Sequence, residues 1–297
     1  MQKDAIMFIV KEKVTMVHIV QATAPNTTTI TTKANRKYIL EENDSYYTQR
    51  FGSTALTYQI NNLKFAYSLL NNPRTILDVG MNIGMNTIEY ATFAKRVVGF
   101  EPTPWVHNWA IKNIIYNKTN IDNTAPQVLK GVNKNPLAQI DTHQIGLSDQ
   151  PAQAVKFKSV SKNNGHNGIV YTQKHKKDTV VQHFEADIST IDLFAYNDVD
   201  FIKIDTEGHE LKVIEGGLNT IKQCRPVIQC EIVPNQCKRY NYSALDIWEL
   251  LVDGLGYKVY TRDGVERTQG MTVEKNQLLH NGEKPKKMMD YFFVYKN

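Results

Sequence analysis

Three acidic residues lie in or directly after short apolar runs, which is where open α/β sheets place their ligand-binding side chains. Asp78 stands within the first of these runs, Glu101 ends the second and Asp205 ends the third. The carboxyl ends of parallel strands meet at one edge of such a sheet, where ligands bind. A carboxylate there can accept both hydroxyl groups of a ribose, and a pair of carboxylates suits a cationic ligand. The acids therefore favour a positively charged nucleoside.

The first acid leads into a glycine turn. Ile76-Leu-Asp-Val-Gly-Met-Asn-Ile-Gly84 has the pattern of a strand that enters a turn, and Met85 to Ala94 continue with helical spacing. A dinucleotide fingerprint would require glycine at positions 82 and 85, where Asn82 and Met85 stand, so NAD and FAD are disfavoured. S-adenosylmethionine fits better, because it combines a sulfonium cation and a ribose with an amino-acid end that the turn could hold.

Four motifs, in this order, resemble those of the FkbM family of class I methyltransferases. They are Ile-Leu-Asp-Val-Gly-Met-Asn-Ile-Gly at 76–84, Gly-Phe-Glu-Pro-Thr-Pro at 99–104, Phe-Ile-Lys-Ile-Asp-Thr-Glu-Gly-His-Glu at 201–210 and Arg-Pro-Val-Ile-Gln-Cys-Glu-Ile at 225–232. The resemblance covers about residues 73–297. It implies S-adenosylmethionine-dependent O-methylation, often of sugar or polyketide hydroxyl groups.

The turn, the acids and the resemblance together give a set of expected cofactor contacts. These are Asp78, Gly80, Asn82, Gly84, Asn86, Thr87, Glu101, Pro102, Ser148, Asp149 and Asp205. The resemblance places Ser148 and Asp149 beside the adenine, although Ser-Asp-Gln-Pro is also good turn chemistry. Trp105 could stack on the adenine or pack in the core.

Methyl transfer to a hydroxyl group gains from a positioned base, and the strand ends offer candidates. Period-two alternation puts Lys203 and Asp205 on one face of their strand and Glu231 on one face of the next. We expect Lys203 and Glu231 to form an ion pair, either catalytic or structural, that holds Asp205 and Glu231 ionised.

His209 and Glu207 are further catalytic candidates. The first turn of a helix disfavours imidazolium, so His209 is expected to be a neutral ring that could accept a proton, unless it only caps a surface turn. Asp205 and His209 are therefore the two candidate bases. Oxygen ligands for Mg²⁺ are available from Asp205, Glu207, Glu210 and Glu231. No spacing establishes a metal site, and none is predicted.

The alternation of strands and helices predicts an α/β fold with a doubly wound, mostly parallel, seven-stranded sheet. We expect residues 1–60 to form an N-terminal extension with a β-hairpin and many aromatic residues, and residues 61–297 to form the methyltransferase domain that the resemblance implies. In the first half of the chain we expect a hairpin over 5–20, a loop over 23–32, a helix ending before Pro73 and a third strand over 143–149. A hairpin over 153–172 and a helix over 211–221 that contains two glycines should follow. The last strands are expected at 257–260 and 291–295 as an antiparallel pair, separated by an insertion over 265–289 that is disordered or a flap.

The charge composition of the chain limits the classes of molecule that it is expected to act on. The chain of 297 residues has 35 basic and 30 acidic residues, a mild excess that is weaker than that of most nucleic-acid-binding proteins. The acceptor is expected to be a hydroxyl group of a small molecule or glycan. RNA ribose methylation and a non-catalytic cofactor-binding module are the alternatives.

The apolar run from Ala5 to Val10 is too short for a signal peptide or a membrane span, so a cytosolic protein is expected. Three cysteines, Cys224, Cys230 and Cys237, match no zinc spacing and are expected to be reduced thiols.

Overall fold

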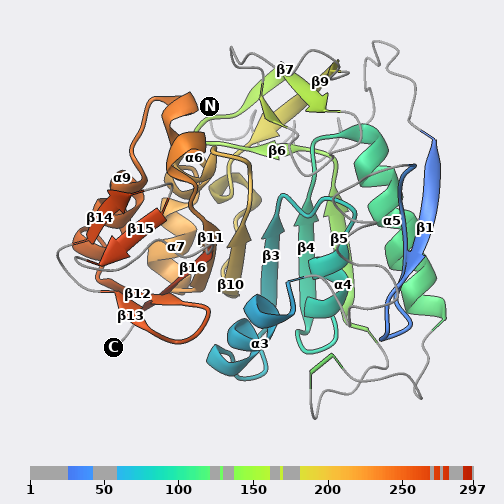
Figure 1. Ribbon diagram of the computed structural model, residues 1–297, viewed down its shortest axis with the longest axis horizontal. Helices are drawn as coiled ribbons and strands as arrows, with labels where there is room; N and C mark the ends of the chain where they lie inside the picture. Colours follow the sequence, from blue (N-terminus) through green and yellow to red (C-terminus); the bar gives the residue numbers. More distant parts are fainter. Residues whose placement is uncertain are drawn as a thin grey trace, which may run out of the picture.

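A mixed sheet of eight strands forms the centre of the molecule, in the order β13-β12-β16-β11-β10-β3-β4-β5 (Figure 1). The computed structural model describes residues 26–42, 59–120, 128–129, 137–160, 168–169, 181–267, 271–274, 277–280 and 290–295. The strands of this sheet are β3 (Thr75–Val79), β4 (Arg96–Phe100), β5 (Gln139–His143), β10 (Val199–Ile204), β11 (Val227–Glu231), β12 (Tyr257–Thr261), β13 (Glu266–Arg267) and β16 (Asp290–Tyr295).

The five strands from β11 to β5 run parallel, and β16, β12 and β13 are antiparallel to their neighbours. The predicted doubly wound, mostly parallel sheet and its terminal antiparallel pair are thus confirmed. The sheet has eight strands rather than seven because the short β13 pairs with β12. Parallel strands end at a common edge, so this topology brings the acids at the ends of β3, β4, β10 and β11 together.

Helices cover both faces of the sheet (Figure 1). They are α3 (Ile60–Leu69), α4 (Met85–Tyr90), α5 (Pro104–Thr119), α6 (Glu210–Glu215), α7 (Leu218–Cys224), α8 (Pro234–Cys237) and α9 (Ala244–Trp248), with short helical turns η2 (Asp192–Phe194), η3 (Lys238–Tyr240) and η4 (Glu249–Asp253). Each face has its own hydrophobic cluster. Along β10, Phe201 packs into the cluster shared with α3, α4 and α5, whereas Ile202 packs into the one shared with α6, α7 and α9.

A second sheet lies over the carboxyl edge of the first, in the order β6-β9-β7-β8 (Figure 1). Its strands are β6 (Gly146–Leu147), β7 (Ala152–Val160), β8 (Gly168–Ile169) and β9 (Val181–Ser189). The pairing of β7 with β8 agrees with the predicted hairpin, and the long partner strand β9 was not predicted. Hairpins β1 (Thr27–Thr31) with β2 (Lys37–Glu41) and β14 (Met271–Glu274) with β15 (Gln277–His280) complete the described strands.

Several local predictions were wrong. The threonine-rich segment predicted as a loop contains β1, since β-branched residues suit a strand. The third strand of the main sheet is β5, which begins earlier than predicted, while the predicted segment supplies β6 of the second sheet. β5 is an edge strand with partly exposed polar residues, so its sequence resembles a loop. The predicted hairpin at 5–20 lies outside the described residues.

The helix predicted over 211–221 is interrupted at its two glycines. α6 ends before Gly216 and α7 begins after Gly217. A Cβ added at Gly216 would lie 1.9 Å from the backbone oxygen of Ser148. The glycine therefore allows this helix pair to approach the segment that follows β6.

Cys224, Cys230 and Cys237 are free thiols, as predicted. Among the described residues, none of the helices has both the length and the apolar composition required to cross a bilayer.

Candidate active site

The turn between β3 and α4 packs directly against the end of β10. Gly80 has a φ of +76°, and a Cβ added to it would meet the backbone oxygen of Asp205 at 2.0 Å. Asn82 also has a positive φ, of 50°, in a region that asparagine tolerates better than most residues. Glycine at position 80 therefore serves close contact between two strand ends, a role that its spacing in the sequence did not reveal.

Glu101 braces this turn from the end of β4. One carboxylate oxygen accepts a hydrogen bond from the backbone N–H of Asn82 at 3.2 Å, and the other accepts from the N–H of Thr103 at 2.9 Å. The side chain is buried, and this burial raises the pKa of Glu101. The Thr103 side chain bonds to the same carboxylate, so these contacts leave it room for one further hydroxyl group of a ligand.

A buried lysine lies between two of the predicted acids. Lys203 Nζ lies 3.2 Å from Asp205 Oδ2 and 3.6 Å from Asp78 Oδ1. It forms no ion pair with Glu231, so that prediction was wrong. The register of β10 explains the error, because Lys203 stands opposite Asp78 of β3 on one side and Gln229 of β11 on the other.

Burial and neighbouring charges shift the pKa values of Lys203 and Asp78 in opposite directions. Burial alone would lower the pKa of Lys203, but the carboxylates of Asp205 and Asp78 outweigh it and raise that pKa. Burial raises the pKa of Asp78, and Lys203 offsets part of the shift together with the Thr87 hydroxyl, which donates to Asp78 at 2.6 Å. Thr87, predicted as a cofactor contact, thus binds the acid beside the turn.

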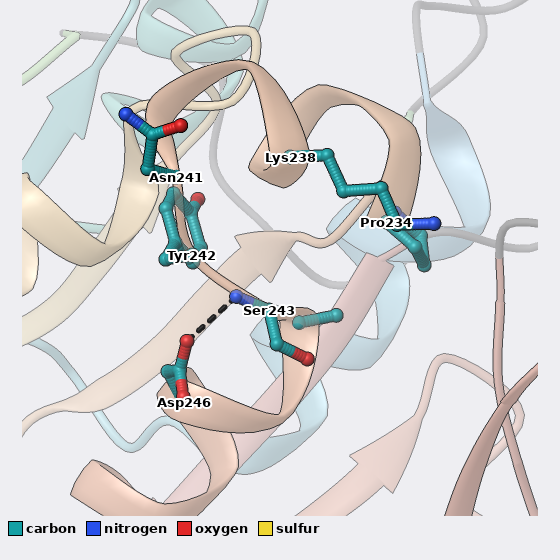
Figure 2. A pocket seen from close by; sticks show the side chains of 7 residues that line it. Pro234, Lys238, Asn241, Tyr242, Ser243 and Asp246 are labelled. Carbon is teal, nitrogen blue, oxygen red and sulfur yellow. Dashed lines mark hydrogen bonds between the residues drawn. The ribbon is translucent and has the colours of Figure 1, made fainter.

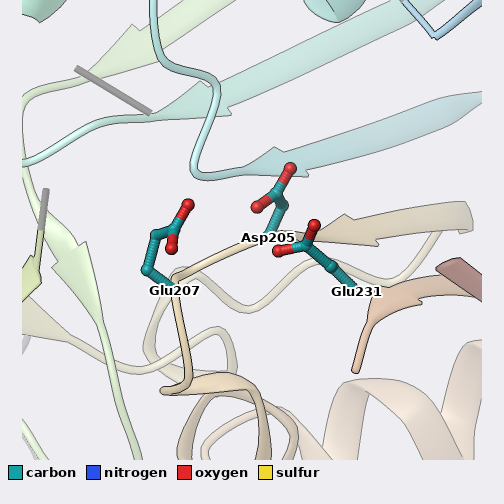
Figure 3. A group of neighbouring side chains, drawn as sticks. All are labelled: Asp205, Glu207 and Glu231. Atoms are coloured by element: carbon teal, nitrogen blue, oxygen red, sulfur yellow. The ribbon is translucent and has the colours of Figure 1, made fainter. Parts of the chain in front are cut away.

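Three carboxylates meet at the ends of β10 and β11 (Figure 3). One oxygen each of Asp205, Glu207 and Glu231 lies within 4.8 Å of the others. Burial raises the pKa of Glu231 well above its ordinary value, and the negative charges of Asp205 and Glu207 add to the shift. The separation would suit one divalent cation, although exposed acidic groups often lie this close without one.

Glu210 is not a member of this carboxylate group. Its Oε1 accepts hydrogen bonds from the N–H of Thr206 at 3.0 Å and of Gly208 at 2.9 Å, and its Oε2 accepts from the Tyr242 hydroxyl at 3.1 Å. Burial raises the pKa of Glu210 to about 7. This side chain therefore fixes the loop between β10 and α6.

The same loop carries Glu207, which has a positive φ of 59°. Its carboxylate accepts a hydrogen bond from the Gln236 side chain at 2.6 Å. These contacts hold Glu207 in the orientation seen in Figure 3, pointing toward Asp205 and Glu231.

His209 faces the opposite direction, toward the segment after β6. Its Nε2 lies 2.9 Å from Ser148 Oγ, and that hydroxyl donates to Asp149 Oδ1 at 2.9 Å. Since the single hydroxyl proton goes to Asp149, Nε2 of His209 is the donor and Nδ1 is the basic nitrogen. Burial lowers the pKa of His209 to about 4, so the ring is neutral as predicted, but for a different reason.

One acidic residue at this edge was missed by sequence reasoning. Asp290 begins β16 and stands opposite Glu231 in register. Gln229 donates to Asp290 at 3.0 Å, and the Asn62 side chain also bonds to it. Asp290 directly precedes the apolar run of the last strand, and an antiparallel strand starts at the edge where its parallel neighbours end. That position is the signal that could have identified it.

The remaining predicted contacts are placed as follows. Asn86 is buried and donates to Gln59 at 3.2 Å, and Pro102 is partly buried beside Gly146. Trp105 packs edge-on against Phe184, with ring centroids 5.2 Å apart. Of the two roles expected for Trp105, this contact corresponds to core packing.

A cavity of about 270 Å³ lies beside the loop that Glu210 holds (Figure 2). It is lined by Pro234, Lys238, Asn241, Tyr242, Ser243, Ala244 and Asp246. The Tyr242 hydroxyl also lies 2.9 Å from the backbone oxygen of Gly208 and shares its single proton between this oxygen and Glu210, so one wall of the cavity is bonded to the loop. Ser243 and Asp246 form the capping box of α9.

The fold and the acids at its carboxyl edge define the class of protein. Five parallel strands with a terminal antiparallel pair, covered by helices on both faces, agree with the sheet expected of a class I methyltransferase. A family model described as the methyltransferase FkbM domain matches residues 78–259. The chain belongs to this family.

Solved structures similar to this chain include methyltransferase FkbM from Methylobacillus flagellatus KT, with 17% identity and a TM-score of 0.46. The match covers 84% of this chain and 50% of that one, so the chain spans about half the length of that relative. Precorrin-6y C5,15-methyltransferase from Geobacter metallireducens GS-15 is similar over 79% of this chain and 87% of that one, with 11% identity and a TM-score of 0.39.

TYW2 from M. jannaschii in complex with AdoMet is similar over 93% of this chain and 86% of that one, with 12% identity and a TM-score of 0.38. A comparison with curated proteins finds none that matches.

Proposed function

We propose that this chain is an S-adenosylmethionine-dependent methyltransferase that acts on a hydroxyl group of a sugar, a glycan or another small molecule. The observation that carries the proposal is the set of buried charges at the carboxyl edge. Asp78 and Asp205 flank Lys203, and Glu101 lies at the neighbouring strand end. Acids in these positions suit a cationic nucleoside and oppose a pyrophosphate.

The chemistry of the donors agrees with the cofactor part by part. Glu101 can accept a ribose hydroxyl with the lone pair that its three protein contacts leave. The backbone N–H groups of residues 80–84 already donate within the protein, so the amino-acid end would meet the first amides of α4, directly after the turn. Ser148 and Asp149, bonded to each other at 2.9 Å, are the residues expected beside the adenine. When bound, S-adenosylmethionine would supply an electrophilic methyl group on a sulfonium.

In the proposed reaction the chain aligns the acceptor hydroxyl and removes its proton. Asp205 is the base that we favour, because it directly follows β10 and lies next to the turn. Its carboxylate contacts Lys203 on one side and faces Glu231 and Glu207 on the other. Lys203 then balances the charge of Asp205 and Asp78 without contacting the acceptor. Alignment can lower the barrier by several kcal/mol, and a base adds roughly 10²- to 10⁴-fold.

His209 is the weaker candidate for the base. Its Nε2 donates to Ser148, and its Nδ1 is buried. A buried nitrogen cannot reach an acceptor that enters from the carboxyl edge. The contact with Ser148 instead supports a role for His209 in shaping the adenine side of the site.

A thermal-shift scan tests the cofactor. S-adenosylhomocysteine should raise the melting temperature and NADH should not, since only the former matches the acids at this edge. Consumption of S-adenosylmethionine stimulated by one member of a panel of sugars and RNAs would then identify the acceptor. Stabilisation by NADH alone would contradict the proposal, and stabilisation by S-adenosylhomocysteine with no acceptor-dependent turnover would favour a binding module.

A further inference from the structure

Two asparagine side chains of α5 extend the edge of the N-terminal hairpin. Asn113 Oδ1 accepts from the N–H of Ile39 at 2.6 Å and its Nδ2 donates to the Ile39 oxygen at 3.1 Å. Asn117 forms the same pair of bonds with Lys37: its Oδ1 accepts from the Lys37 N–H at 3.1 Å, and its Nδ2 donates to the Lys37 oxygen at 2.8 Å. Residues four apart on a helix are about 6 Å apart and residues two apart on a strand about 6.7 Å, so the two amides match alternate residues of β2.

Asn113 makes one contact that Asn117 does not. Its Nδ2 donates a second hydrogen bond, of 2.9 Å, to the backbone oxygen of Ile83 in the turn between β3 and α4. Both hydrogens of the Asn113 amide are therefore used, one on the hairpin and one on the turn. Asn113 is 1% exposed and Ile83 is 1% exposed, so water cannot readily replace this bond.

The turn needs such external contacts, because its own backbone is unusual. Three of its residues, Gly80, Asn82 and Gly84, have positive φ values. Glu101 holds it on one side through the Asn82 N–H, and Asn113 holds it on the other through the Ile83 oxygen. A conformation of this kind persists only when the surrounding structure fixes it.

A buried ion pair joins the same hairpin to the helix that follows the turn. Arg36 Nε lies 3.1 Å from Glu89 Oε1, and the two side chains are 6% and 1% exposed. Arg36 belongs to the hairpin loop and Glu89 to α4. The hairpin therefore contacts the turn region at two separate points.

We propose that Asn113 is a positioning residue for the cofactor turn and that it couples the N-terminal hairpin to that turn. The inference rests on the proposed function, because cofactor affinity is one of its two readouts. Asn113 acts through the Ile83 oxygen and does not contact the cofactor. When the bond is lost, the turn spends less time in the conformation that binds, and the apparent affinity falls by the same factor.

The test compares two alanine variants by calorimetric titration with S-adenosylhomocysteine. Asn113→Ala should weaken binding about tenfold, which corresponds to about 1.4 kcal/mol. Asn117→Ala is the matched control, since it removes an equivalent pair of bonds to Lys37, together with a bond to the Asn113 backbone oxygen, and no bond to the turn. Its affinity should stay within about twofold of wild type. Both variants should lower the melting temperature. Equal affinities, or an equal loss in both variants, would overturn the role of Asn113.

Hydrogen exchange measured by mass spectrometry tests the same inference without the cofactor. A peptide spanning the turn should exchange faster in Asn113→Ala than in Asn117→Ala, because only the former loses the bond to the Ile83 oxygen that holds the turn, so its N–H groups open more often. Equal exchange would contradict the inference even if the wild-type chain failed to bind S-adenosylhomocysteine, a failure that would by itself count against the proposed function. Asn113→Asp, of nearly the same size but without donors, should behave as the alanine variant does.

Discussion

At the scale of single residues, the lysine within β10 determines how the acids at this edge can coexist. Lys203 is 2% exposed, and it separates Asp78, which is fully buried, from Asp205. Without it, two carboxylates would face each other in a site shielded from water. Removing one partner of a buried charge group is usually strongly destabilising, because the remaining charge stays uncompensated.

Lys203→Met should therefore lower the free energy of unfolding by about 3–5 kcal/mol at neutral pH. Urea denaturation measures this directly. Lys212→Met serves as the control, since Lys212 forms ion pairs of similar length, at 3.0 and 2.8 Å, but is 36% exposed, and it should lose less than about 1 kcal/mol. Similar losses in the two variants would show that Lys203 does not neutralise the buried acids.

His209 gives a prediction for pH. Burial lowers its pKa in the folded chain to about 4, from 6.5 in the unfolded chain. Between these values only the unfolded chain is protonated, so this residue makes the fold less stable as pH falls from 6.5 toward 4, by on the order of 3 kcal/mol. His209→Gln should remove that part of the loss, as measured by urea denaturation at a series of pH values.

The pKa values of other groups are shifted too, but their effects on stability are the same in the variant and in wild type and so cancel in the comparison. Burial lowers the pKa of His107 to about 4 as well, and it raises that of Glu210 to about 7, so Glu210 has the opposite effect, with stability lost as pH rises from 4.5 to 7. Both are present in each variant. Parallel pH curves for wild type and His209→Gln would mean that His209 is not held neutral by burial.

The sequence predicted which acids lie at the carboxyl edge but not what each of them contacts. Asp78, Glu101 and Asp205 could be identified because each stands at or near the end of an apolar run. The partner of Lys203 could not, because it depends on which strand lies on either side of β10. Whether the identified residues bind the cofactor stays a prediction.

At the scale of elements, the break between α6 and α7 positions the predicted adenine side of the site. A Cβ at Gly216 would lie 1.9 Å from the Ser148 backbone oxygen, whereas one at Gly217 would meet only the Ile191 Cδ1 at 3.0 Å and other atoms farther away. A side-chain methyl group can move aside, and a backbone carbonyl in a packed segment cannot do so without shifting its neighbours.

Gly216→Ala should thus destabilise the protein by about 3 kcal/mol and weaken binding of S-adenosylhomocysteine, since Ser148 and Asp149 must move. Gly217→Ala should change stability by less than about 1 kcal/mol and leave affinity unchanged. Chemical denaturation and calorimetric titration provide the two readouts. If both variants behaved alike, the close approach at Gly216 would not be what places Ser148.

Elements with strong periodicity were predicted well, and those defined by their neighbours were not. β10 and β11 follow apolar patterns that long-range pairing does not alter. β5 and β9 carry many polar residues because one is an edge strand and the other belongs to a small sheet, so pairing rather than pattern decides them. The strands with which β5 and β9 pair cannot be predicted from the local sequence alone.

At the scale of the whole molecule, the carboxyl edge of the sheet collects an excess of negative charge. Asp205, Glu207, Glu231 and Asp290 lie near one another there, and Lys203 is the buried cation beside them within the described part of the chain. The second sheet covers the same edge (Figure 1). This arrangement agrees with a cationic cofactor whose hydroxyl acceptor enters beside the acids.

A crystal structure of the protein with S-adenosylhomocysteine tests this account most directly. The account predicts a ribose hydroxyl within hydrogen-bond distance of the Glu101 carboxylate, the amino-acid end at the first amides of α4, and the adenine beside Ser148 and Asp149. A nucleoside bound elsewhere, or an edge that takes up a pyrophosphate in its place, would contradict it.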